Sequence, residues 1–137
     1  MRYKTTSWEQ TYELAKNWAK NLKGSDIIIL NGQLGAGKTV FTKGLAAGLG
    51  VKQPVLSPTF VLFRQYKGEK LDLYHFDMYR LSDSSEAIEA GFDEYIGKET
   101  AVTVIEWADK VQDILKNISY TVDITYVDDN TRLVEIK

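Results

Sequence analysis

Residues 26–39 read DIIILNGQLGAGKT, a short apolar segment followed at once by a glycine-rich one. The apolar part, residues 26–30, is rich in β-branched side chains and nearly continuous, a pattern typical of a strand buried on both faces. Residues 38–49 then have helical character, and Gly50 follows where such a helix would end. The order of strand, glycine-rich loop and helix predicts an α/β domain with parallel strands at its centre.

The glycine-rich loop, residues 32–39, fits the pattern G-x-x-x-x-G-K-[ST] in the strand-to-helix context that this pattern requires. Its glycines let backbone N–H groups turn toward a phosphate, and the positive end of the following helix attracts the anion. We expect Lys38 to bridge the β- and γ-phosphates and Thr39 to offer its hydroxyl to Mg²⁺. Val40 can contribute only its backbone N–H, and the loop does not encode which base is bound.

The rest of the chain adds strands and helices around this unit. Ser7 with Gln10 has the spacing of a capping box before a helix that extends to about Leu22, and Asp83 with Glu86 repeats it before a shorter helix. The other expected elements are strands at 60–66, 71–77, 101–105, 118–127 and 132–136 and a short helix at 111–115. The fold class predicted is a P-loop NTPase-like three-layer α/β sandwich, with a mixed, mainly parallel central sheet and antiparallel edge hairpins.

Two acids compete to complete the metal site. Glu106 follows the apolar run at 101–105, where an acid at the carboxyl end of a central strand can reach a nucleotide-bound Mg²⁺. Asp77 ends a strand whose residues alternate, which is less typical of the centre of a parallel sheet. We therefore favour Glu106 as the Mg²⁺ ligand and expect Asp77 to act through water or through that ligand. The plainer interpretation of each is a solvated carboxylate at a strand end.

The histidine and the tryptophans have simpler structural interpretations. His75 is the one histidine of the chain and has no adjacent nucleophile and acid, so a structural role is favoured over proton transfer. Trp107 follows Glu106 and could lie against a nucleotide, contribute to a partner surface or pack in the core. Trp8 and Trp18 share a helical face, so we expect both in the core.

Length and composition exclude several classes of protein. The 137 residues suit a single domain over residues 1–137, and 44% hydrophobic with 26% charged residues is typical of a compact globular protein. A formal net charge of −2 gives no basic surface for holding nucleic acid unaided. The chain has no cysteine, which excludes disulfides, a thiolate metal site and a catalytic thiol.

Hydropathy predicts no membrane segment. Residues 1–10 lack the apolar stretch of a signal peptide, and no apolar run approaches the roughly 20 residues that a membrane span requires. We therefore expect a soluble, cytoplasmic protein without a membrane partner.

Four segments together carry a more specific signal: GQLGAGKT at 32–39, SPTF at 57–60, HFDMYRL at 75–81 and VIEW at 104–107. In this order and spacing the chain resembles the bacterial TsaE family, over roughly residues 7–136. The resemblance implies a P-loop ATPase of tRNA threonylcarbamoyladenosine biosynthesis that works with two other proteins, TsaB and TsaD. It also implies that tRNA, modified at the adenosine beside the anticodon, is reached only indirectly through that complex.

The resemblance also implies roles for individual residues. The residues that would bind ATP are Gly35, Ala36, Gly37, Lys38, Thr39 and Val40 at the phosphates, Trp107 beside the nucleotide, and Thr11 and Arg132 from the first helix and the C-terminal hairpin. Thr39 and Glu106 would hold Mg²⁺, and Lys38, Asp77 and Glu106 would be the catalytic residues. Residues 57–59 match a segment likened to a GTPase switch. Gln33 stands where an acid is common, and Val40 replaces a frequent second threonine.

Other P-loop functions fit less well. A GTPase would need a guanine-reading Asn/Thr-Lys-x-Asp segment, and none follows the strand that ends at Glu106. A small-molecule kinase usually stabilises its transition state with arginines near the phosphates, but the chain has only Arg2, Arg64, Arg80 and Arg132. The third alternative is a switch protein in which bound nucleotide sets partner affinity without hydrolysis.

Overall fold

The computed structural model describes residues 1–33, 35–58 and 62–137. These residues form a seven-stranded sheet in the order β1-β7-β6-β2-β5-β4-β3. The strands are β1 (Arg2–Thr5), β2 (Ile27–Asn31), β3 (Phe63–Tyr66), β4 (Asp72–Asp77), β5 (Ala101–Glu106), β6 (Tyr120–Tyr126) and β7 (Arg132–Ile136). The four central strands β6, β2, β5 and β4 pair in parallel, and β3, β7 and β1 join them antiparallel at the edges. The expected mixed sheet with antiparallel edge hairpins is thereby confirmed.

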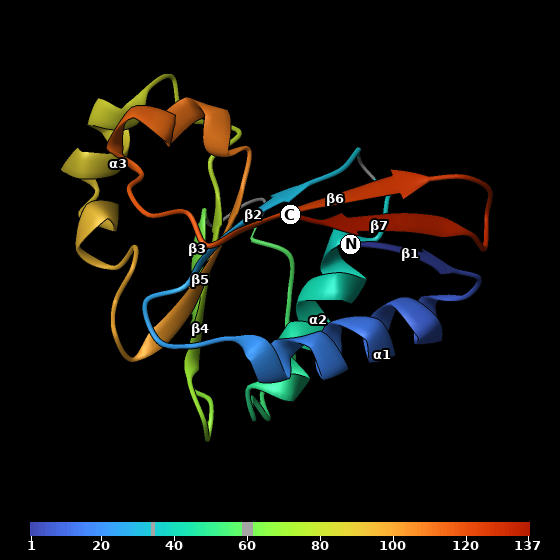
Figure 1. Ribbon diagram of the computed structural model, residues 1–137. Helices are drawn as coiled ribbons and strands as arrows, with labels where there is room; N and C mark the ends of the chain where they lie inside the picture. Colours follow the sequence, from blue (N-terminus) through green and yellow to red (C-terminus); the bar gives the residue numbers. More distant parts are fainter. Residues whose placement is uncertain (34, 59–61) are drawn as a thin grey trace.

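Helices cover the sheet on both faces, which gives the three predicted layers (Figure 1). On one face lie α1 (Trp8–Trp18), continued by the 3₁₀ turn η1 (Ala19–Asn21), and α2 (Lys38–Gly48). On the other lie α3 (Ser84–Glu89), η2 (Phe92–Glu94) and η3 (Ala108–Ile114). Each helical layer closes its own apolar core against the sheet. Strands β2, β5 and β4 contribute to both cores, which explains why the sequences of β2 and β5 are almost continuously apolar.

The first helix begins with the predicted cap, in a shifted form. The Ser7 hydroxyl oxygen accepts a hydrogen bond from the Gln10 backbone N–H at 3.1 Å. In a standard capping box the Gln10 side chain would accept a hydrogen bond from the backbone N–H of Ser7. Here it accepts from the backbone N–H of the preceding residue, Thr6, at 2.7 Å. Asp83 likewise accepts from Ser85 N–H and begins α3.

Helices α1 and α2 approach each other closely at two glycines of α2. A Cβ added to Gly44 would collide with the carbonyl oxygen of Tyr12, and one added to Gly48 would lie 2.6 Å from that of Lys16. This contact fixes the position of α2, and therefore of the loop that precedes it, against the sheet.

The structure differs from the sequence prediction in several places. Strand β1 was not predicted; it pairs with β7 and makes the C-terminal hairpin part of a three-stranded antiparallel edge. The core prediction for Trp18 is confirmed, with 6% of its surface exposed, but that for Trp8 is wrong, since Trp8 is 64% exposed in the first turn of α1. The expected helix at 111–115 is a 3₁₀ helix that begins earlier, at Ala108. The first residues of the strand expected at 60–66 lie outside the described residues, and its described part is β3. Among the described helices, none is long and apolar enough to cross a membrane.

Candidate functional site

A cavity of about 490 Å³ opens at the carboxyl ends of the parallel strands. The glycine-rich loop after β2 forms one wall, and the ends of β4 and β5 form the other. This is the position at which open α/β sheets bind their ligands. The described residues that line it are Gly35, Gly37, Lys38, Thr39, Ser57, Asp77, Tyr79, Glu106 and Trp107. Six of the predicted site residues therefore meet in one cavity: Gly35, Gly37, Lys38, Thr39, Asp77 and Glu106, with Trp107 as a seventh at its mouth.

The loop has the backbone of a phosphate cradle. Gly35 and Gly37 have φ values of 78° and 107°, in the left-handed region that favours glycine. Gly37 is the residue before α2, and the first turn of that helix carries no acidic side chain. The N–H groups of a first helical turn have no intrahelical acceptor, so this end of α2 is suited to an anion.

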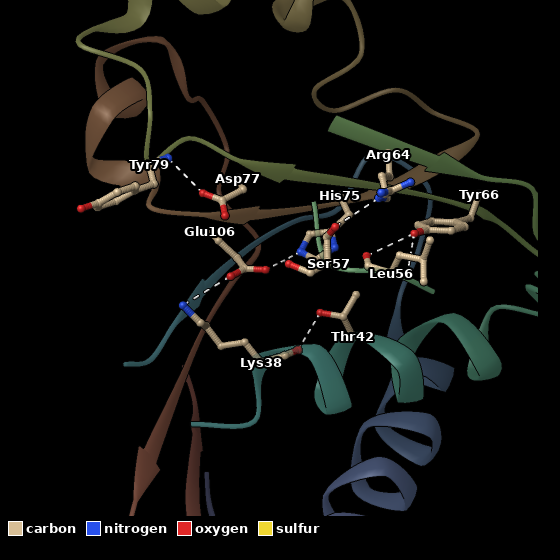
Figure 2. A network of polar contacts seen from close by, with 10 residues as sticks. All are labelled: Lys38, Thr42, Leu56, Ser57, Arg64, Tyr66, His75, Asp77, Tyr79 and Glu106. Carbon is tan, nitrogen blue, oxygen red and sulfur yellow. Dashed lines mark hydrogen bonds and ion pairs between the residues drawn. The ribbon is translucent and has the colours of Figure 1, made fainter. Parts of the chain in front are cut away.

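Glu106 lies at the centre of a buried polar network, shown in Figure 2. Its Oε1 is 3.3 Å from Nζ of Lys38, and its Oε2 is 2.6 Å from Nε2 of His75. The parallel register that pairs Asp77 with Glu106 explains this arrangement: His75, two residues before Asp77, points to the same face of the sheet. Because a carboxylate only accepts hydrogen bonds, Nε2 of His75 carries the proton. Among the described residues, Nδ1 of His75 has no hydrogen-bond partner.

The charge of Glu106 is maintained by its neighbours. Burial raises the pKa of Glu106, but the hydrogen bond from His75 and the positive charge of Lys38 lower it, and the net pKa lies below the ordinary glutamate value. Glu106 is therefore ionised at neutral pH. An ionised carboxylate facing the first residue of α2 can bind a cation or orient a water molecule.

Asp77 lies beside Glu106 on the neighbouring strand, with 4% of its surface exposed. Its Oδ1 accepts a hydrogen bond from the backbone N–H of Tyr79 at 3.0 Å. Strand β4 is buried along most of its length and pairs in parallel with β5, so the expectation that Asp77 ends a strand less typical of the centre of a parallel sheet was wrong. Burial does not distinguish the two acids. Their contacts distinguish them, because Glu106 pairs with Lys38, whereas Asp77 accepts a hydrogen bond from the turn after β4.

Trp107 lies at the mouth of the cavity and is 44% exposed, which excludes the core interpretation. Its backbone has a left-handed φ of 57°, unusual for a non-glycine residue. Its ring centroid is 4.8 Å from that of Tyr79 and 5.7 Å from Nζ of Lys38. The two aromatic rings make an apolar rim that could contact a planar ligand group.

The remaining predicted residues lie outside the cavity lining. Thr11 is 2% exposed, and its Oγ1 lies 2.7 Å from Oγ1 of Thr5. Ala36 is buried, and Val40 is half-buried in the first turn of α2. Arg132 donates from Nε to the carbonyl of Ala36 at 2.9 Å rather than lining the cavity. Of the segment likened to a switch, Ser57 lines the cavity and Thr59 lies outside the described residues.

His75 and Tyr79 are the site residues that sequence reasoning missed. For His75 a structural role was favoured over proton transfer, and the structure adds a direct contact with Glu106 that the sequence did not predict. The available signal was its spacing of two from Asp77 on a strand, which places both side chains on one face.

The lining residues fit a nucleotide-bound Mg²⁺ ion. Thr39 supplies a hydroxyl oxygen and Glu106 a carboxylate, both hard ligands, in the same cavity. No group of three or more His, Cys, Asp or Glu suited to a metal ion occurs in the part of the chain that the structure describes. Mg²⁺ in phosphate-transfer sites takes only one or two protein ligands and completes its shell with phosphate and water, so these two donors suffice.

A mixed sheet whose central parallel strand leads through a glycine-rich loop to a lysine at the start of a helix defines a P-loop nucleotide-binding protein. The sequence model of one P-loop family, "Threonylcarbamoyl adenosine biosynthesis protein TsaE", matches residues 5–134. The chain belongs to this TsaE family, as its four sequence segments predict.

Individual relatives agree with this assignment. The chain is 39% identical to the tRNA threonylcarbamoyladenosine biosynthesis protein TsaE of Bacillus subtilis (strain 168), over 96% of this chain and 82% of that protein. It is 42% identical to the protein of the same name from Aquifex aeolicus (strain VF5), over 95% and 90% of the two chains. The crystal structure of Bacillus subtilis YdiB superposes with a TM-score of 0.80 at 34% identity, covering 98% of this chain and 82% of that one.

Proposed function

We propose that this protein is a Mg²⁺-dependent ATPase that acts with TsaB and TsaD in tRNA threonylcarbamoyladenosine biosynthesis. Its family and relatives place it in that pathway. The single observation that carries the ATPase assignment is the placement of Lys38 and Glu106, 3.3 Å apart, beside the glycine-rich loop. A cation for phosphate and an acid for a phosphate-bound metal ion are the two charges that this chemistry requires.

Each lining residue then has a definite task. The N–H groups at the start of α2 and the Lys38 ammonium bind the phosphates and neutralise the charge that develops on them. Thr39 and Glu106 would hold Mg²⁺, which, when bound, would neutralise the negative charge that develops on the phosphates. Asp77, fixed by the N–H of Tyr79, is placed to orient a water molecule through its second oxygen.

The isolated protein should hydrolyse ATP slowly, because no arginine is among the described residues that line the cavity. An arginine that reaches the transferred phosphate accelerates many P-loop enzymes by orders of magnitude, and a partner protein can supply it. The exposed rings of Tyr79 and Trp107, 58% and 44% exposed, offer such a partner an apolar contact at the mouth of the cavity. Interaction with tRNA would then occur only through the complex.

The test is phosphate release from ATP by the protein alone and with TsaB and TsaD from the same organism. Stimulation that Lys38→Ala abolishes would support the proposal, and an isolated protein as fast as the full assembly would contradict it. Thr39→Ala and Glu106→Ala should also abolish turnover; near-normal turnover in Glu106→Ala would assign the metal to Asp77 instead. Tight ATP binding without phosphate release would favour a nucleotide-dependent switch, and phosphate transfer to an added small molecule a kinase.

A further inference from the structure

The side chain of Arg132, at the start of β7, connects the C-terminal hairpin to the glycine-rich loop. Its Nε donates to the carbonyl oxygen of Ala36 at 2.9 Å, and its Nη2 donates to that of Gly35 at 3.3 Å. These residues are far apart in sequence, so the tertiary fold alone brings the guanidinium to the loop.

The hairpin holds this guanidinium firmly in place. The third nitrogen, Nη1, donates to the carbonyls of Asp128 at 2.6 Å and Thr131 at 3.0 Å. The guanidinium carbon lies 4.7 Å from the ring centroid of Tyr126, whose hydroxyl donates in turn to Asp129 at 2.6 Å. All three nitrogens of Arg132 are therefore engaged with the protein.

The contact with Ala36 determines where the next N–H points. In a trans peptide the carbonyl and the following N–H point in opposite directions, and no described peptide bond is cis. Arg132, which is not among the described residues that line the cavity, holds the Ala36 carbonyl on its own side of the loop, so the N–H of Gly37 is directed to the other side. Gly37 lines the cavity, and N–H groups at this position of the loop are the donors that a phosphate needs.

We infer that Arg132 is a positioning residue that holds the glycine-rich loop in its phosphate-binding form. This inference rests on the proposed binding of ATP. It differs from the expectation that Arg132 touches the nucleotide, because a positioning residue affects the phosphate site and is indifferent to the base. The role also requires arginine, because lysine has all its N–H donors on one nitrogen and cannot reach the two loop carbonyls and the hairpin turn at once.

The test compares Arg132→Lys and Arg132→Gln with the wild-type protein, using calorimetric binding of ATP and of inorganic tripolyphosphate. We expect each variant to bind both ligands more weakly, by the same factor of about tenfold or more, because the loss of one to two hydrogen bonds to the loop costs free energy on this scale. Arg2→Lys is the control, because Arg2 lies on the neighbouring strand β1, where its exposed side chain pairs with Glu135 at the surface. Weaker ATP binding with unchanged tripolyphosphate binding would overturn the inference and support direct contact with the nucleoside.

A second measurement needs no ligand and guards against a folding defect. In ¹H–¹⁵N spectra of the variants, the Gly37 amide resonance should move, whereas that of Gly91, which lies in a distant turn after α3, should not. An unmoved Gly37 resonance in a folded variant would overturn the inference. Failure of the wild-type protein to bind ATP would instead contradict the proposed function, and the two failures are therefore distinguishable.

Discussion

Nζ of Lys38 lies 3.3 Å from Oε1 of Glu106, so the residue that would bind phosphate and the one that would hold the metal ion are paired with each other. The two ends of this pair differ in their surroundings. The Glu106 side chain also contacts His75, whereas the Lys38 ammonium faces the open cavity and the ring of Trp107. Binding of a phosphate would therefore move the lysine and leave the acid in place.

Glu106→Gln should separate nucleotide binding from turnover. Loss of the carboxylate removes the metal ligand, so phosphate release should be abolished, while Lys38 becomes free of its competing partner. When Mg²⁺ is chelated, we therefore expect the variant to bind ATP at least as tightly as the wild-type protein does. Added Mg²⁺ should increase the ATP affinity of the variant less than that of the wild type. Calorimetry with and without Mg²⁺ measures both effects, with Glu89→Gln on the exposed side of α3 as control. Much weaker binding of ATP without Mg²⁺ would show that Glu106 does not compete with the phosphates for Lys38.

Lys38→Met should destabilise the fold in a pH-dependent manner. The lysine helps to lower the pKa of Glu106, and a lowered carboxyl pKa stabilises the folded state above the unfolded pKa of about 4.3. This contribution is lost as the pH falls through the lowered folded pKa. The variant should therefore lose about 1–3 kcal/mol at pH 7 and less at about pH 3.

Urea unfolding of Lys38→Met at several pH values measures this difference. Lys43→Met is the matched control, because Lys43 is an exposed lysine on the same helix. A loss of stability that stays constant down to pH 3 would exclude an electrostatic origin.

Local sequence patterns predicted the centre of the fold and the loop, but not the contacts between strands. The strand, loop and helix around Lys38 lie close together in sequence, so spacing alone identifies them. The pairing of β4 with β5, which sets His75 and Asp77 beside Glu106, joins residues about 30 positions apart and has no local signature. Strand β1 was missed for a similar reason: its four residues, RYKT, contain one apolar side chain, too few for a recognisable pattern, and they form a strand only by pairing with β7.

His75→Asn should retain ATP binding and reduce turnover. Asparagine is too short to replace the Nε2 hydrogen bond to Glu106, so the carboxylate would lose its fixed orientation while Lys38 and the loop remain. In His75→Gln the side-chain amide can reach the position of Nε2, and most of the turnover should return. Steady-state phosphate release and ATP binding of the two variants test this prediction. Equal loss in both variants, or loss of ATP binding, would indicate that the imidazole itself has a further role.

Thr11→Val should alter stability and not nucleotide affinity. Thr11 and Thr5 are 2% and 3% exposed, and their hydroxyls share one hydrogen bond, so Thr11→Val leaves the Thr5 hydroxyl buried without this partner, at a cost of about 1–3 kcal/mol. Thr5→Val should cost less, because the Thr11 hydroxyl still donates to the carbonyl of Ser7 at 3.4 Å. The double variant Thr5→Val/Thr11→Val removes both hydroxyls and should recover part of that loss, a coupling that a double-mutant cycle measures. Because Thr11 lies outside the cavity lining, ATP affinity should stay within twofold of the wild-type value in all three variants. Reduced ATP affinity in a fully folded Thr11→Val protein would instead support the nucleotide contact that the family resemblance implies, and would require α1 to approach the bound ligand.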